Sequence, residues 1–209
     1  MNTGEDYFSI VKHYETCLDL YGDNHAGVDW PNAVDADKRY RVMLDVIREP
    51  HEKVTLLDFG CGASHMVDHI KKRQLNNIDY AGLDLSSKFT ALSQKKNPEL
   101  PFYCMDVLQG HKELPVFDYV VMNGVFTEKR DMSYDNMFAY FTELITLMFS
   151  KAQRGLAFNV MSKAVDWERE DLFHLSTDSL VKFLVKNISR NYVIRSDYGL
   201  YEYTTYVYR

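Results

Sequence analysis

The stretch Leu56–Ser64, LLDFGCGAS, runs a short apolar strand into a turn that contains two glycines. Gly60 and Gly62 lack a Cβ atom, so we expect backbone N–H groups of the turn to approach a ligand closely. A helix that begins near Ser64 would point its N-terminus at the same place. Because tight strand-to-helix turns also use glycine for structural reasons, the neighbouring segments must decide between these interpretations.

From residue 54 onward, short apolar runs alternate with helix-like stretches. The runs VTLLDF, YAGLDL, FYCMDV, FDYVVMN and GLAFNVM are typical of buried parallel strands. The segments between them carry apolar residues three and four positions apart, as amphipathic helices do. This β-α-β-α order predicts an α/β fold with a doubly wound, Rossmann-like sheet.

The two ends of the chain have a different character. A polar insertion at about 162–175 leads into a helix, and two β-rich runs, NYVIRSDYG and YEYTTYVYR, follow it. They predict an antiparallel C-terminal hairpin that completes a seven-stranded sheet. Residues 1–50 hold two predicted helices joined by the turn-rich linker GDNHAGVDWPN, and we expect this segment to cover the C-terminal edge of the sheet.

Three aspartates stand at the ends of three consecutive predicted strands. Asp58 opens the glycine turn, Asp84 ends YAGLD, and Asp106 ends FYCMD. Asp84 follows Gly62 at a spacing that suits an acid accepting hydrogen bonds from ribose hydroxyls, and Asp106 could then meet an exocyclic amine of adenine. Each aspartate taken singly could be a turn former or a helix N-cap. All three in register favour a nucleoside-binding edge.

These motifs resemble those of the class I S-adenosylmethionine-dependent methyltransferases, of the bacterial small-molecule type. LLDFGCGAS is similar to the first motif of that family, GLDLS to the ribose-binding second, CMDV to the adenine-contacting third and FDYVVMNGVF to the fourth. The resemblance implies a single methyltransferase domain over 1–209, with 1–50 as helical cover and 51–209 as cofactor-binding core. Ser64 departs from the motif, which often has a third glycine there.

The resemblance also implies which residues contact S-adenosyl-L-methionine. The methionine moiety would lie beside Asp58, Gly60, Cys61 and Gly62, the ribose beside Asp84 and Leu85, the adenine beside Asp106 and Val107, and the sulfonium beside Asn123 and Gly124. In the leader segment, Tyr14, Trp30 and Arg41 are further candidates, with Arg41 for the methionine carboxylate. The alternative is that Trp30 anchors the core and Arg41 is a solvated helix residue.

A nicotinamide cofactor is the competing interpretation of the glycine turn. That fingerprint requires G-x-G-x-x-G, and His65 occupies the position of its last glycine. A side chain there would obstruct the close packing of helix on strand. We therefore favour the methyltransferase.

Methyl transfer needs few catalytic side chains, because the cofactor already carries the activated group. A hydroxyl acceptor normally wants a general base. His174, in the insertion, is our first candidate and His25 the second, although His174 could simply make structural hydrogen bonds. Asp166, Trp167 and Glu168 could shape an acceptor pocket or form a solvated charged run.

Histidines also raise the question of a metal. His65 and His69 are four residues apart, but HMVDH lacks the glutamate of H-E-x-x-H and no third ligand is evident. We expect no metal.

Composition limits the partners. The net charge is −6 and the pI about 5.6, with no basic run, so we expect no nucleic-acid partner. No window is apolar enough to span a membrane, the N-terminus lacks a leader pattern, and three widely spaced cysteines indicate reduced thiols. We expect a cytoplasmic protein, and the sequence leaves the oligomeric state open.

The expected activity is methyl transfer to a small-molecule acceptor. We favour O-methylation of a sugar or similar metabolite in polysaccharide or secondary-metabolite biosynthesis, a preference that comes from the family resemblance. The alternatives are an N-methyltransferase of a small amine and a non-catalytic partner protein that binds S-adenosylmethionine.

Overall fold

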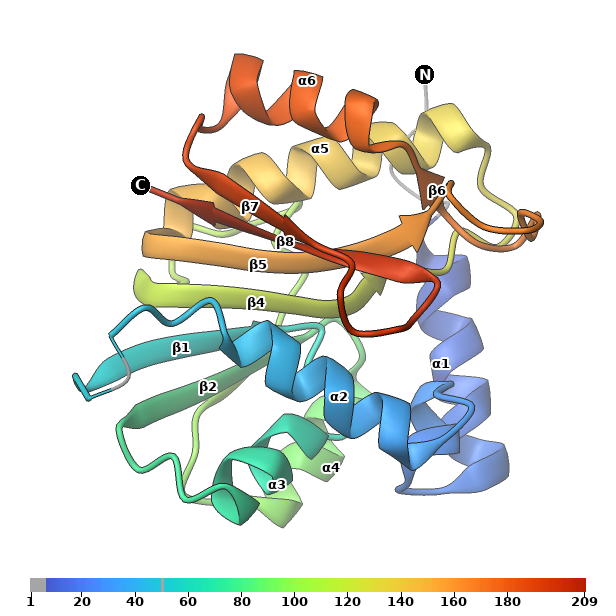
Figure 1. Cartoon of the computed structure of the whole chain (residues 1–209). Helices are drawn as coiled ribbons and strands as arrows, with labels where there is room; N and C mark the ends of the chain where they lie inside the picture. The colour runs from blue at the N-terminus through green and yellow to red at the C-terminus, as the bar shows by residue number, and fades with distance from the viewer. Residues whose placement is uncertain (1–6, 50) are drawn as a thin grey trace.

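The structure is a computed structural model that describes residues 7–49 and 51–209. Figure 1 shows a central sheet with helices on both faces. The helical elements are α1 Phe8–Tyr21, the 3-10 helix η1 His25–Val28, α2 Ala33–Leu44, α3 His65–Lys72, α4 Ser87–Lys96, α5 Tyr134–Lys151 and α6 Thr177–Asn187. The strands are β1 Val54–Phe59, β2 Ile78–Asp84, β3 Phe102–Cys104, β4 Phe117–Phe126, β5 Ala152–Ser162, β6 His174–Leu175, β7 Tyr192–Arg195 and β8 Glu202–Tyr208.

The sheet has the predicted doubly wound topology. Its strand order is β3-β2-β1-β4-β5-β8-β7, and the pairs from β3 to β5 are parallel. The chain winds outward from β1 in one direction to β3 and then in the other direction from β4, so strand order reverses between β1 and β4. Ligands of open α/β sheets bind beyond the carboxyl ends of the strands at such a reversal.

The antiparallel C-terminal hairpin is confirmed, and it forms one edge of the sheet, with β7 as the outermost strand. β8 pairs antiparallel with both β5 and β7. All residues of β8 are buried although their sequence alternates, because neighbouring strands and helices enclose both faces. The insertion adds an unexpected short strand, β6, which pairs in parallel with the end of β5, with His174 opposite Met161. The sheet therefore has eight strands, not the predicted seven.

Two apolar clusters fill the two faces of the sheet. One joins α5 and α6 to inward residues such as Leu57, Val120 and Phe158. The other joins the ends of α2 and α3 to Leu56, Tyr119 and neighbouring residues. α4 packs against β2 and β3. Serines begin several of these helices, as the STDS segment predicts for α6: the side chain of Ser176 accepts the N–H of Ser179.

The helical segment that covers the carboxyl ends of the strands is smaller than predicted. α1 stands beyond the carboxyl ends of β4 and β5 in Figure 1, and η1 packs against α1. α2 instead lies on a sheet face, because its C-terminal residues Val42, Met43 and Leu44 are buried there. The assignment of 1–209 to one domain stays a prediction. In the described part of the chain, no helix has the length and apolarity needed to cross a membrane.

Candidate active site

One pocket opens at the carboxyl ends of β1, β2, β3 and β4, beneath α1 and η1. It holds about 1100 Å³ of space, its open mouth included. All ten residues that the four motifs predict to contact cofactor contribute to its wall: Asp58, Gly60, Cys61, Gly62, Asp84, Leu85, Asp106, Val107, Asn123 and Gly124. The strand ends therefore converge as the sequence pattern predicts, while the role of each residue remains a prediction.

The glycine turn is built differently from our expectation. The N–H groups of Gly60 and Cys61 donate to the carbonyl oxygen of Leu83, at 2.7 and 3.0 Å, and that of Gly62 donates to Asp84. The prediction that these N–H groups face a ligand is therefore wrong. Both glycines have positive φ, +72° and +50°, and a Cβ on Gly60 would lie 2.7 Å from the side chain of Val125. Glycine is needed for backbone conformation and close packing.

Ser64 shows why a third glycine is common at its position. Its φ is +55°, in the left-handed region that glycine adopts easily. The side chain is fully buried, and its Oγ accepts a hydrogen bond from the Asn97 amide at 3.2 Å. This contact holds a serine in the conformation that glycine would otherwise provide.

Two carboxyl groups, that of Asp58 buried and that of Asp84 partly buried, give the pocket its electrostatic character. Asp84 Oδ2 accepts the N–H of Gly62 and Oδ1 accepts that of Ser86, both at 2.9 Å, and burial still raises the pKa of Asp84 to about 6. Asp58 Oδ2 accepts the Tyr80 hydroxyl at 2.8 Å, and burial raises the pKa of Asp58 to about 7. A ligand that brings hydroxyl donors or a positive charge would stabilise the ionised forms.

The third acid lies at the other end of the pocket. Asp106 Oδ1 accepts the N–H of Leu108 at 3.0 Å, and Oδ2 accepts the hydroxyl of Tyr7 at 2.6 Å. Burial and this hydrogen bond raise the pKa of Tyr7 to about 12. Tyr7 also stacks on Tyr140, with ring centroids 5.0 Å apart, so aromatic side chains from the start of α1 and from α5 meet beside Asp106, where the adenine is predicted to lie.

The end of β4 presents an unsatisfied polar atom. Asn123 lines the pocket, and its Oδ1 is buried with no hydrogen-bond partner among the described residues. A buried carbonyl oxygen without a partner is costly, so this position suits a ligand that brings a donor. Beside it, Gly124 has φ +80° and packs against Trp30, whose ring would lie 2.8 Å from an added Cβ. Tyr14 donates its hydroxyl to the Gly124 carbonyl at 3.3 Å.

A buried polar network behind Trp30 was not found from the sequence. The guanidinium of Arg39 stacks over the Trp30 ring at 4.1 Å, and its Nε lies 2.9 Å from Glu202 Oε2. Glu202 Oε1 accepts the Asn159 amide at 3.0 Å, and Asn159 Oδ1 accepts the Gly124 N–H at 2.8 Å. The Arg39 Nη1 is buried and has no hydrogen-bond partner among the described residues, and Arg39 lies outside the pocket lining.

The sequence pointed to Arg41, two residues away, as the candidate for the methionine carboxylate. Arg41 instead lines a separate groove with Asp45 and Arg195. Tyr14 and Trp30 do line the main pocket, as predicted. No sequence signal distinguishes Arg39 from Arg41. Which of the two contacts Trp30 depends on how α2 is rotated about its own axis when it packs on the sheet.

His174 lies apart from the pocket lining. It is buried, its Nδ1 lies 2.6 Å from the Ser162 carbonyl oxygen, and its Nε2 accepts the N–H of Arg169 at 3.2 Å. With Nδ1 as donor, both ring nitrogens are engaged with backbone groups, and neither is free to take a proton from an acceptor. The structure gives the base role no support, and the assignment stays a prediction.

The other histidines considered in the sequence also have partners. His25 Nδ1 lies 2.7 Å from the Trp30 carbonyl oxygen. His65 pairs with Asp23 and His69 with Asp37, each at 2.8 Å, so these two rings do not converge on one point. In the charged run of the insertion, the Trp167 side chain is exposed, outside the pocket lining.

Comparisons with known proteins agree with this geometry. Residues 57–144 match the sequence model of a family described as a methyltransferase domain. A Mycobacterium tuberculosis protein, Rv1506c, whose name carries a provisional methyltransferase assignment, is 25% identical over 155 residues, which cover 72% of this chain and 90% of that protein.

Solved structures share the fold at low identity. Magnesium protoporphyrin IX methyltransferase of Synechocystis PCC 6803 with bound SAH superposes with TM-score 0.66 at 17% identity, over 97% of this chain and 99% of that one. The plantazolicin methyltransferase BpumL, with a desmethylPZN analog and SAH, gives 0.61 at 14% identity, over 96% and 98%. An S-adenosylmethionine-dependent methyltransferase of Clostridium acetobutylicum gives 0.59 at 10%, over 97% and 98%. Residues 57–144 thus match a methyltransferase domain, and the chain as a whole shares the fold of solved S-adenosylmethionine-dependent methyltransferases.

Proposed function

We propose that the pocket binds S-adenosylmethionine in one orientation along the strand ends. The methionine moiety lies at Asp58 and the glycine turn, the ribose at Asp84 and Leu85, the adenine at Asp106 and Val107, and the sulfonium at Asn123 and Gly124. The supporting observation is that the ends of β3, β2, β1 and β4, which lie side by side in that order, contribute residues widely separated in sequence to one pocket.

The cofactor carries hydrogen-bond donors and a positive charge, which suit the carboxyl groups of the pocket. Asp58 and Asp84 are carboxyl groups whose pKa values burial raises to about 7 and about 6, so an ammonium and a ribose diol would restore their charged forms. Bound cofactor supplies an activated methyl group. The chain's own residues then hold it in line with an acceptor and, through α1 and Trp30, exclude water.

We assign the acceptor to small polar metabolites and favour O-methylation of a sugar or similar molecule. Tyr14 in the cover donates its hydroxyl to the Gly124 carbonyl, and burial, with the charge of Glu128, raises the pKa of Tyr14 well above the usual value. A neutral hydroxyl and a buried carboxyl group favour an acceptor that hydrogen-bonds over one that is purely apolar. The structural neighbours named for a magnesium porphyrin and for plantazolicin show how different the acceptors of this fold can be.

Two alternatives remain distinct in their consequences. A small amine as acceptor would be N-methylated, and it needs only to be deprotonated and oriented. A non-catalytic protein would bind the cofactor without turnover.

We place the protein in the cytoplasm, an assignment that its three free cysteines support.

The first experiment is titration calorimetry of the purified protein with S-adenosylmethionine and S-adenosylhomocysteine, with NADH as control. Binding of the first two alone is the expected result. NADH binding, or binding of neither methionine compound, would contradict the proposed site. An acceptor screen that starts with nucleotide sugars and small amines, read out as S-adenosylhomocysteine formation, then separates O-methylation, N-methylation and absence of turnover.

A further inference from the structure

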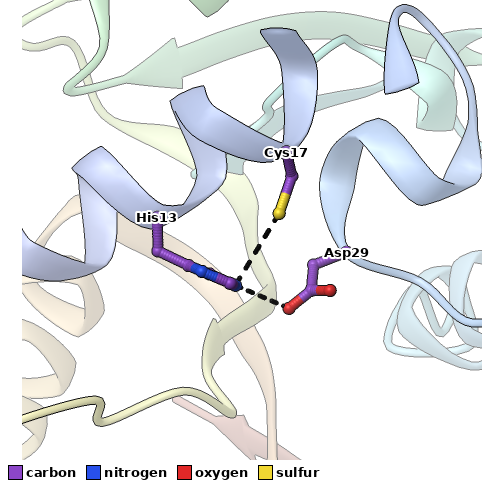
Figure 2. A group of neighbouring side chains, drawn as sticks. All are labelled: His13, Cys17 and Asp29. Atoms are coloured by element: carbon purple, nitrogen blue, oxygen red, sulfur yellow. Dashed lines mark hydrogen bonds and ion pairs between the residues drawn. The ribbon is translucent and has the colours of Figure 1, made fainter. Parts of the chain in front are cut away.

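Three side chains with different metal-ligating atoms meet between α1 and the end of η1. They are His13, Cys17 and Asp29, and their ligand atoms all lie within 4.8 Å of one another. Figure 2 shows the imidazole between the thiol and the carboxylate. His13 Nε2 is 2.7 Å from Asp29 Oδ2 and 3.8 Å from Cys17 Sγ. None of the three belongs to the lining of the cofactor pocket.

The local structure explains why these atoms converge. His13 and Cys17 are four residues apart on α1, so they share one face of the helix. Asp29 follows η1 with φ +58°, a left-handed conformation that aspartate tolerates better than most residues. Its N–H is held by the carbonyl groups of Ala26 and His25. The carboxylate thus reaches α1 from a backbone that is fixed independently.

The nitrogen-to-sulfur separation is close to that of a tetrahedral site. With Zn–N near 2.0 Å and Zn–S near 2.3 Å, nitrogen and sulfur ligands on one zinc ion lie about 3.5 Å apart. The observed nitrogen-to-sulfur distance of 3.8 Å is similar. The nitrogen-to-oxygen distance of 2.7 Å is that of a hydrogen bond, and it would lengthen to about 3.4 Å when an ion takes the place of the proton.

We infer that His13, Cys17 and Asp29 form a binding site for a divalent transition metal ion of the zinc class, with three protein ligands and an open fourth position. A thiolate is a soft ligand and an imidazole an intermediate one, so the set disfavours Mg²⁺ and Ca²⁺. On binding, the thiol proton and any imidazole proton pass to solvent. One thiolate and one carboxylate then balance the two positive charges of the ion. This inference differs from our sequence expectation of no metal, which considered only His65 and His69.

An ion at this site would also affect the segments that cover the cofactor pocket. Tyr14 follows His13, and Val28 and Trp30 flank Asp29; all three line the cofactor pocket. An ion shared by α1 and the residue after η1 therefore fastens together the two segments that cover the cofactor. The inference does not depend on the identity of the methyl acceptor.

The test is titration of chelator-stripped protein with Co²⁺, followed by displacement with Zn²⁺. We expect one equivalent to bind with thiolate-to-cobalt charge-transfer absorption and the intense visible bands of tetrahedral Co²⁺, and zinc to abolish both. Cys17→Ser should lose the charge-transfer band. Asp29→Asn and His13→Gln should each weaken binding by about 10-fold or more. Cys104→Ser removes an exposed thiol elsewhere and should change nothing.

Several outcomes would overturn the site. They are no stoichiometric binding, an unchanged spectrum in Cys17→Ser, or a spectrum lost in Cys104→Ser. Circular dichroism of each variant checks that it is folded. Zinc should also raise the melting temperature and slow amide hydrogen exchange in α1, in the wild type but not in Cys17→Ser. Zinc that bound without either effect would overturn the fastening role.

Discussion

The backbone N–H of Gly62 donates to Asp84 Oδ2 at 2.9 Å and thereby joins the turn after β1 to the end of β2. The same carboxylate accepts the N–H of Ser86 at the start of α4. Asp84 therefore holds the shape of two adjacent strand-to-helix connections, and it keeps lone pairs for a ligand as well. A residue that resembled an independent ribose acceptor in the sequence is also part of the pocket's backbone support.

Asp84→Ala should lower the affinity for S-adenosylmethionine by about 100-fold or more, because hydrogen bonds to a charged group contribute roughly 1.5–3 kcal/mol each. It should also reduce the free energy of unfolding, since two N–H groups lose their acceptor. Calorimetry and chemical denaturation measure the two effects. Asp79→Ala, on the same strand but with an exposed side chain, is the matched control and should leave both unchanged. Wild-type affinity in Asp84→Ala would refute the assignment.

Asp58 should make stability and cofactor affinity depend on pH in opposite directions. Burial raises its pKa from the ordinary 3.8 to about 7. Between these values the folded protein binds more protons than the unfolded chain, so the free energy of unfolding falls as pH rises. Cofactor affinity should rise over the upper part of the same range, because the ionised carboxylate is the form that binds an ammonium.

Asp58→Asn separates these effects. The variant should no longer become more stable as pH falls from about 7 to about 4, and its free energy of unfolding at about pH 8 should be higher than that of the wild type. It should also bind the cofactor more weakly, with an affinity that depends less on pH. Denaturation and calorimetry at several pH values provide the measurement. A variant that lost both stability and affinity at high pH would show that the buried charge is not the cause.

The strands and the glycine turn were predictable because buried parallel strands are continuous apolar runs and their carboxyl ends must meet at one edge. The direction of the Gly60 and Gly62 N–H groups was not, since it depends on the Leu83 carbonyl and the Asp84 carboxylate at the end of the neighbouring strand. Arg39 and Glu202 are 163 residues apart, and their pairing follows from tertiary register alone. The same holds for Asp29 and His13.

Gly60→Ala should lower the free energy of unfolding by about 1–3 kcal/mol, because an alanine at φ +72° is strained and its Cβ would meet Val125. Cofactor affinity should fall with it, since the turn lines the pocket. Gly110→Ala is the control, because nothing lies within 4 Å of its added Cβ. Equal stabilities of the two variants would contradict the argument.

Glu202→Ala should destabilise the protein by about 3–5 kcal/mol, because it leaves the largely buried guanidinium of Arg39 without its counter-ion. The loss should extend to cofactor affinity through Asn159 and Gly124. Asp45→Ala breaks a more exposed pair with Arg195 and should cost less than about 1 kcal/mol. Denaturant titration compares the two, and similar losses would mean that the network contributes no more than a surface pair.

His174→Ala separates a structural histidine from a catalytic one. The change leaves the Ser162 carbonyl and the Arg169 N–H without their ring partners, so the free energy of unfolding should fall by about 1–3 kcal/mol. Cofactor affinity should stay normal, because the ring does not line the pocket. Once an acceptor is known, turnover of the folded variant decides its role. Turnover close to wild type is expected from the geometry, whereas a loss that a higher solution pH restored would mark the ring as the base after all.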